Sequence, residues 1–380
     1  MANVRRLVVP LVARRCPSVA LRHGADVVVC QDRPPGKRAG ARTRIPNMRR
    51  RDVLTAILSL GAAVSLGACE KKTERTERTW RVGLLLAGLG EAAVATHRRV
   101  IVEHLERHGF VEGRNLRLEV RRGGYSPTED ADVVRALIAW QPDVIFVETS
   151  PFASRTREAT GTIPIVFIGV ADPIGTGLIK DFARPGGNAT GVHFSQLEMG
   201  AKRLELLRGL LPDARRVMVA RYLGNREFDA LPQLRAAASG LGLEIVEAMV
   251  DATSGFPTPP SSSVYGKPDA IYSGDPWMTY GVEHVVDQII RFGAEQRIPS
   301  LFWEAEATER GATLAYGVNM TRELGRAADQ LARVLKGAKP SELPVDISTE
   351  YELVVNKKAA AALGIAIPSS ILTRANRVIE

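Results

Sequence analysis

Two sequence blocks recur in the same order, and this internal repeat constrains the fold more than any other feature. The block QPDVIF at residues 141–146 is echoed by KPDAIY at 267–272, and IPIVF at 163–167 is echoed by IPSLF at 298–302. In each copy a Pro-Asp pair opens an apolar run typical of a buried parallel strand. A helical stretch follows, and an Ile-Pro pair opens the next strand. The repeat predicts two similar α/β lobes.

Strand and helix patterns alternate around these blocks. In the first half, strands are expected at 81–86, 115–120, 144–147 and 163–168, with helices between them. In the second half, strands are expected at 216–220 and 243–249, with helices at 199–210 and 228–240. Alternation of this kind implies parallel, doubly wound sheets. The fold class is therefore α/β, with two Rossmann-like doubly wound lobes joined by a hinge.

The turn cluster RPGGN at 184–188 sets the expected boundary between the lobes. Lobe 1 is predicted at 80–188 plus about 307–345, and lobe 2 at 189–306 plus about 346–380. The tail crosses between them. One stretch departs from the pattern, because the Pro- and Ser-rich run at 257–263 stands where a helix is due.

An export leader precedes the lobes. Three arginines at 49–51 are followed by an uncharged segment from 53 to 68 and then by Cys69, in the order Leu-Gly-Ala-Cys. This order resembles a bacterial lipobox, so 48–68 is interpreted as a signal peptide and Cys69 as the lipidation site. The alternative is a transmembrane helix, but the run is short and contains glycines. Residues 69–79 are expected to form a polar tether, and 1–47 a non-native or disordered extension.

The leader also explains the basic character of the chain. Residues 1–69 hold 13 of the 51 Lys and Arg but only 3 of the 42 Asp and Glu, so the remainder carries 38 basic against 39 acidic side chains. A nearly neutral body lacks the footprint of nucleic-acid binding. Of the three cysteines, Cys16, Cys30 and Cys69, only the last follows the cleavage point. We therefore expect no disulfide and no thiol chemistry.

Candidate site residues are sought where ligands bind open parallel sheets, beyond the carboxyl ends of the strands. Hydroxyls and backbone N–H groups there suit a carboxylate, acids suit an ammonium group, and aromatic rings suit an apolar side chain. The candidate ligand-binding residues are Ala87, Gly88, Thr149, Ser150, Asp172, Ser273, Asp275, Trp277, Trp303, Glu304 and Tyr316. The alternatives are that the Asp-Pro pairs at 172 and 275 are ordinary turn chemistry and that the tryptophans pack beneath the cleft.

Two other patterns are weighed against simpler explanations. Gly88, Gly90 and Ala93 form G-x-G-x-x-A between a strand and a helix, like a dinucleotide fingerprint, with Glu119 placed to bind a ribose. The pattern is short and common, and an exported protein meets no NADH pool. His104 and His108 are four apart on a predicted helix and could share a metal, but no third ligand is evident, so a solvated helix face is favoured. We expect no metal, no cofactor and no catalytic residue.

Longer stretches carry a family resemblance. They include GFVEGRN at 109–115, DPIGTGL at 172–178, ARPGGNATG at 183–191, KRLELL at 202–207 and LVVN at 353–356. Together they resemble the TrpX-like ABC transporter substrate-binding protein family. The resemblance implies a type I periplasmic binding protein fold, whose two lobes close on a ligand.

The expected function is thus an extracytoplasmic solute-binding protein of an ABC importer. It would act in the periplasm or cell envelope, lipid-anchored through Cys69, as a monomer that docks on a membrane permease. By resemblance the first candidates for its solute are amino acids with an aromatic or branched side chain, and other small polar solutes stay open. The alternatives are an NAD(P)-binding oxidoreductase and a ligand-sensing module for a membrane kinase.

Overall fold

The computed structural model describes residues 78–380 apart from 88–89, 124–126, 223–230, 251–266 and 275–282. The predicted leader, Cys69, the tether up to residue 77 and the Pro-Ser run at 257–263 lie outside the described residues. Within the described chain the strands form two sheets, ordered β11-β5-β4-β3-β1-β2 and β13-β12-β10-β9-β8-β6-β7. Every pairing is parallel except that of β10 with β12. This confirms the predicted fold class.

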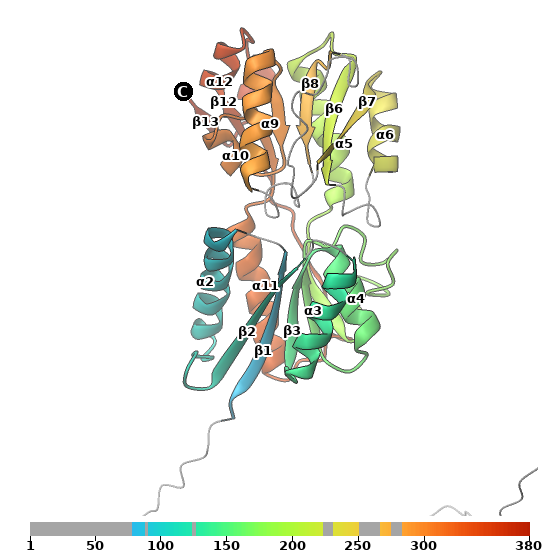
Figure 1. Cartoon of the computed structure of the whole chain (residues 1–380), viewed down its shortest axis with the longest axis vertical. Helices are drawn as coiled ribbons and strands as arrows, with labels where there is room; N and C mark the ends of the chain where they lie inside the picture. The colour runs from blue at the N-terminus through green and yellow to red at the C-terminus, as the bar shows by residue number, and fades with distance from the viewer. Residues whose placement is uncertain (1–77, 88–89, 124–126, 223–230, 251–266, 275–282) are drawn as a thin grey trace, which may run out of the picture. The chain divides into compact units, whose positions relative to one another are not determined.

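The first sheet is built mainly from the N-terminal half of the described chain (Figure 1). Its strands are β1 (Trp80–Ala87), β2 (Leu116–Gly123), β3 (Val144–Glu148), β4 (Ile165–Ile168), β5 (Ala189–His193) and β11 (Asp346–Ile347). Its helices are α2 (Glu91–Arg107), α3 (Pro127–Ala139), α4 (Ser150–Ala159) and α11 (Met320–Leu335). Buried side chains of α2 and α11 pack on one face, and those of α3 and α4 on the other.

The second sheet has the same layered plan. Its strands are β6 (Arg216–Tyr222), β7 (Glu244–Val250), β8 (Ala270–Ser273), β9 (Ser300–Phe302), β10 (Leu314–Gly317), β12 (Glu352–Asn356) and β13 (Arg377–Ile379). Its helices are α5 (Gln196–Leu210), α6 (Leu231–Gly240), α9 (Glu283–Gln296), α10 (Glu306–Glu309), α12 (Lys357–Ala362) and α13 (Ser369–Leu372). Alternate residues of β6 face opposite layers: Val217 and Val219 pack with α5 and α6, and Met218 and Ala220 with α9.

The sequence repeat is a structural repeat. In the first sheet, Asp143 accepts a hydrogen bond from Arg81 N at 2.8 Å and returns its own N–H to Arg81 O at 2.8 Å. In the second, Asp269 accepts from Arg216 N at 2.9 Å and returns its N–H to Arg216 O at 2.8 Å. Each Pro-Asp pair thus fastens its strand to the start of the neighbouring strand. This shared task explains why both blocks carry the same residues.

The second block of the repeat also matches. The carbonyl oxygen of Pro164 accepts from Ile145 N, and that of Pro299 accepts from Ile271 N, both at 2.9 Å. A proline has no N–H to offer a ladder, but its carbonyl still pairs at the first position of a strand. In both sheets the Ile-Pro pair therefore starts the strand beside the Pro-Asp strand.

The chain passes between the sheets at different points from the expected lobe ranges. The turn cluster at 184–188 does not end the first sheet, because a further strand of that sheet, β5, follows directly at residue 189. Asn188 O accepts from Ile165 N at 2.7 Å, and its side chain donates to the carbonyls of Thr160 and Ile163. Likewise β10, expected near the first lobe, pairs with β9 of the second sheet. The crossings fall at 194–195, 318–319 and 348–351.

Helix α11 shows the return of the chain to the first sheet. It follows β10 of the second sheet but packs against α2 and against β4 and β5, where Figure 1 shows it beside α2. Asn319 caps its start by accepting from Arg322 N at 3.1 Å.

The histidine pair lies in this helix–helix contact, so the predicted solvated face is wrong. His104 Nδ1 and His108 Nε2 lie 3.0 and 2.9 Å from the same Asp329 Oδ1 of α11. Burial by itself raises the pKa of Asp329, but hydrogen bonds from the two histidines outweigh it and leave the pKa below its ordinary value. Among the described residues no cluster of three or more His, Cys, Asp or Glu is arranged to hold a metal ion. Nor does the described part contain a helix with the length and apolarity to span a bilayer.

Candidate ligand-binding site

The described candidate residues lie at the carboxyl ends of the strands, as parallel-sheet topology requires. Ala87 ends β1, Thr149 and Ser150 follow β3, Asp172 lies in the turn after β4, and Ser273 ends β8. Trp303 and Glu304 follow β9, and Tyr316 lies near the end of β10. Gly88, Asp275 and Trp277 lie outside the described residues. The described candidates therefore divide between two sheet edges.

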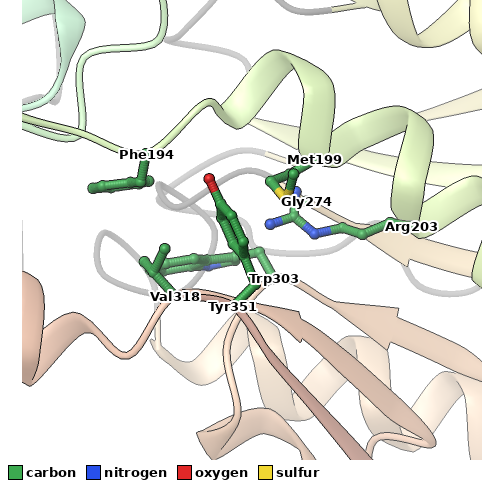
Figure 2. Close-up of a pocket in the computed structure, with 7 residues that line it drawn as sticks. All are labelled: Phe194, Met199, Arg203, Gly274, Trp303, Val318 and Tyr351. Atoms are coloured by element: carbon green, nitrogen blue, oxygen red, sulfur yellow. The ribbon is translucent and has the colours of Figure 1, made fainter. Parts of the chain in front are cut away.

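One pocket opens at the edge of the second sheet (Figure 2). We call it the aromatic pocket; its lining residues are Phe194, Met199, Arg203, Gly274, Trp303, Val318 and Tyr351. Three of these, Phe194, Val318 and Tyr351, come from the three segments that cross between the sheets. The pocket therefore adjoins every described crossing. A ligand held there would touch each segment that must bend if the lobes move.

Aromatic rings form much of the pocket wall. Trp303 is only 2% exposed, and its backbone N–H donates to Ser273 O at 3.1 Å, which ties it to the next strand. The rings of Tyr316 and Tyr351 lie near each other, with centroids 6.0 Å apart. The Tyr351 hydroxyl donates to Ser348 O at 3.1 Å, and burial raises its pKa despite a hydrogen bond with Ser195. These rings suit an apolar or aromatic group.

Arg203 is the one cation among the residues that line the pocket. It lies on α5 and is 4% exposed. Its Nε donates to Tyr316 O at 2.7 Å, and Figure 2 shows the guanidinium group reaching toward the ring of Tyr351. No carboxylate of the described chain forms an ion pair with it. A buried cation in this state is costly, because burial removes most of its hydration and one hydrogen bond replaces only part of it.

Gly317 lets the backbone of β10 pack closely against Trp303. A Cβ atom built there would lie 1.8 Å from Trp303 O and 3.4 Å from Arg203 Nη2. Any larger residue would therefore push the strand or the guanidinium away. The backbone of β10 approaches the Trp303 carbonyl closely because this position has no side chain.

The edge of the first sheet carries a strained residue. Thr149 has a φ of +72°, which is rare for a β-branched residue, and it precedes α4 without a side-chain capping bond. Its Oγ1 is buried and has no hydrogen-bond partner in the described structure. An unused hydroxyl at the start of a helix fits the prediction that Thr149 helps bind a carboxylate, and that role stays a prediction.

Ser150 and Asp172 already have structural partners. Ser150 Oγ accepts from Ala171 N at 3.0 Å, which joins the start of α4 to the loop after β4. Asp172 is exposed, and its carboxylate accepts from Gly175 N at 2.7 Å within its own turn. These contacts are the turn chemistry considered as the alternative for Asp172. A ligand contact from either residue remains a prediction.

A buried charge pair, not foreseen from the sequence, lies behind this first edge. His97 Nδ1 of α2 and Glu148 Oε1 of β3 are 2.7 Å apart, and both side chains are almost fully buried. Burial by itself lowers the pKa of His97, but the charge and hydrogen bond of Glu148 outweigh it and leave the pKa above its ordinary value. Glu306 of α10 acts in the same direction.

Of the candidate residues, Trp303 lines the aromatic pocket and Tyr316 supports it through its carbonyl and its ring. Ser273 and Glu304 are buried, and each is the chain neighbour of a residue that lines the pocket. The Oγ atom of Ser273 has no hydrogen-bond partner in the described part. The prediction missed Arg203, although a signal exists. On α5 the buried positions 200, 204 and 207 form one stripe, and Arg203 is a cation within it.

The duplicated strand order, with three crossings and a pocket at the sheet edge, is the plan of type I periplasmic binding proteins. A conserved domain protein from Vibrio cholerae O1 biovar El Tor has the same fold, with a TM-score of 0.68 and 28% identity over 79% of this chain and 100% of that one. A Streptococcus pneumoniae ABC domain solved with L-Trp gives a TM-score of 0.67 at 23% identity, with the same coverage, 79% and 100%.

The chain belongs to the ABC transporter substrate-binding protein family, which matches residues 88–379. A curated relative, the tyrosine-binding protein of Clostridioides difficile, is 27% identical over 270 residues, which cover 70% of this chain and 76% of the relative. The resemblance predicted from the sequence is confirmed. Proteins of this family are extracytoplasmic, bind small solutes and interact with ABC permeases, and such solute-binding proteins are not enzymes.

Proposed function

We propose that this protein is the receptor of an ABC importer and that it binds an amino acid with an aromatic or branched side chain. The observation that carries the proposal is the aromatic pocket, which combines Trp303 and Tyr351 with the buried cation of Arg203. Aromatic walls with a charged group suit a small zwitterion that carries an apolar side chain. The 27% identity to a tyrosine-binding protein supports the same class of ligand.

The mechanism follows from the position of the pocket. The ligand would contact Phe194, Val318 and Tyr351, one from each crossing segment, together with residues of the second sheet edge. Thr149 and Ser150 of the first edge would complete the site when the lobes close. The ligand would thus favour the closed form by contacting it more extensively, and that form would dock on the permease. No covalent bond changes.

Attachment to the membrane would come from the leader. The signal peptide at 48–68 would be removed, and a lipid on Cys69 would hold the mature monomer at the cell envelope. Mass spectrometry of the membrane fraction would detect the lipidated peptide. An unprocessed leader in a cytosolic fraction would contradict this part of the proposal.

The two alternatives can be separated by observation. An oxidoreductase would use Gly88, Gly90 and Glu119, but Glu119 is already in an ion pair with Arg121 at 2.6 Å. Saturable binding of NAD(P)H, followed by fluorescence, would favour the enzyme. A sensor for a membrane kinase would share the fold. Genes for a permease and an ATPase beside this one favour transport, whereas a histidine kinase gene favours sensing.

A thermal-shift screen tests the main proposal. The folded protein is mixed with each of the common amino acids and with a set of sugars. A true ligand at 100 times its Kd stabilises the fold by about 2.7 kcal/mol, because it binds the native state alone. We expect the largest shifts from L-tyrosine, L-tryptophan and L-phenylalanine. Shifts from sugars only would contradict the proposed ligand class.

A further inference from the structure

Two arginines on α5 differ in how their guanidinium groups are used. Arg208 donates from Nη1 to the carbonyls of Pro212 and Ala214, each at 2.7 Å, and from Nη2 to Leu241 O. Arg203 is more deeply buried, and within the described part of the chain it makes one hydrogen bond, from Nε to Tyr316 O. The same helix thus carries one arginine whose two Nη groups both donate to backbone carbonyls and one whose Nη groups have no protein partner in the described chain.

The free end of Arg203 faces a space. Its side chain lines the aromatic pocket, and Figure 2 shows the guanidinium group reaching toward the ring of Tyr351. Arginine cannot relieve its burial by losing a proton, as lysine or histidine can. Its four remaining N–H donors therefore need an acceptor, and an anion is the acceptor that also compensates the charge.

The geometry favours a carboxylate. The bond from Nε to Tyr316 O holds the guanidinium plane, so the two Nη groups present a fixed fork. A fork of parallel N–H groups matches the two oxygens of a carboxylate. The rings of Trp303 and Tyr351 stand beside it and would take the apolar part of the same ligand.

We propose that Arg203 binds the carboxylate of the transported solute and so makes the pocket selective for aromatic carboxylic acids. This inference rests on the proposed function and narrows it: a free carboxylate is required, and neutral analogues are rejected. Tyr316, through its carbonyl, is a positioning residue for Arg203.

The test compares acids with matched neutral analogues. Isothermal titration measures L-tyrosine against L-tyrosinamide, and L-tryptophan against L-tryptophanamide, in four proteins: wild type, Arg203→Gln, Arg203→Lys and Arg208→Gln. In the wild type we expect the acid to bind about 100-fold more tightly than the amide, since a charge-assisted pair is lost with the amide. Arg203→Gln should bring this ratio close to one, and Arg203→Lys should leave a reduced preference.

Arg208→Gln is the matched control. It removes an arginine from the same helix, so it should lower the melting temperature but keep the preference for the acid. If Arg203→Gln bound the acid as tightly as the wild type does, the proposal would be overturned. A uniform loss of acid and amide binding in Arg203→Gln and Arg203→Lys would also overturn it, because that result reports a structural role only.

A second measurement separates this inference from the proposed function. If neither amino acid binds the wild type, the proposed ligand class fails. Melting curves with 3-phenylpropanoate and phenylacetate, which lack an ammonium group, then decide about Arg203. A stabilisation present in the wild type and absent in Arg203→Gln supports the carboxylate site. No stabilisation of the wild type by any of these acids overturns it.

Discussion

The carboxyl edges of the two sheets differ in whether a buried charge has a counterion. Behind the first edge, His97 and Glu148 compensate each other at 2.7 Å. At the second edge, Arg203 is just as buried, yet its charge has no counterion in the described chain. The first pair therefore has a structural role, since its two charges compensate each other without a ligand. At the second edge, the charge of Arg203 is compensated only when an anionic ligand binds, which is the behaviour expected of a binding site.

The largest expected effect comes from breaking the compensated pair. Glu148→Ala leaves His97 buried without its partner, so the free energy of unfolding should fall by about 3 kcal/mol. Urea denaturation at pH 6 measures it. The double variant His97→Ala/Glu148→Ala should lose less than the two single variants together, because the orphaned group is then absent. A loss below about 1 kcal/mol for Glu148→Ala would show that the pair contributes little to the fold.

The second prediction concerns the uncompensated edge. Arg203→Met removes a buried cation and puts apolar volume in its place, so the ligand-free protein should keep its stability or gain up to about 1 kcal/mol. Arg208→Met leaves three carbonyls without a donor and should lose about 2 kcal/mol. Thermal melting of both variants in the absence of ligand measures the two changes in stability. If Arg203→Met lost as much as Arg208→Met, the two arginines would both be structural.

The smallest expected effect is a pH dependence of the first edge. The pKa of His97 is raised above its ordinary value of 6.5, so protonated His97 is favoured by folding. Its stabilisation is fully present below pH 6.5 and is lost as the pH rises through the pKa of the folded state. The difference in stability between wild type and His97→Gln should therefore shrink from pH 5.5 to pH 9. Both Glu148 and Glu306 face this histidine, and a difference that grew with pH would contradict the sign.

Much of the fold could be predicted because its signals are local. Apolar runs, helical stripes and the turn residues between them depend on neighbours in the chain, and they placed most strands and helices correctly. The repeated Pro-Asp and Ile-Pro pairs added the long-range element, since equal residues perform equal tasks at Asp143 and Asp269. The crossing points were harder. The strand at 189–193 could extend the first sheet or start the second, and the outcome depends on which edge strand is free to pair with it. The residues of this strand do not by themselves identify that partner.

The candidate site was predicted less completely. The rule that ligands bind beyond strand ends identified Trp303 and Tyr316, because strand ends can be located in the sequence. It missed Phe194, Val318 and Tyr351, whose meeting depends on three crossings far apart in the chain. It also missed Arg203, which lies on a helix and not in a loop. The available signal was a cation in the buried stripe of this helix. The stripe alone does not show whether a carboxylate elsewhere in the chain lies close enough to form an ion pair with it.

By itself the amino-acid sequence determined the α/β class, the duplicated plan and the family, since these rest on short local patterns and on their repetition along the chain. Only the tertiary structure decided which charges are balanced. His97 meets Glu148 across a helix–strand contact, whereas Arg203 meets a carbonyl and an open pocket. Electrostatic compensation depends on distances of a few ångströms between residues remote in the chain, and those distances exist only after folding.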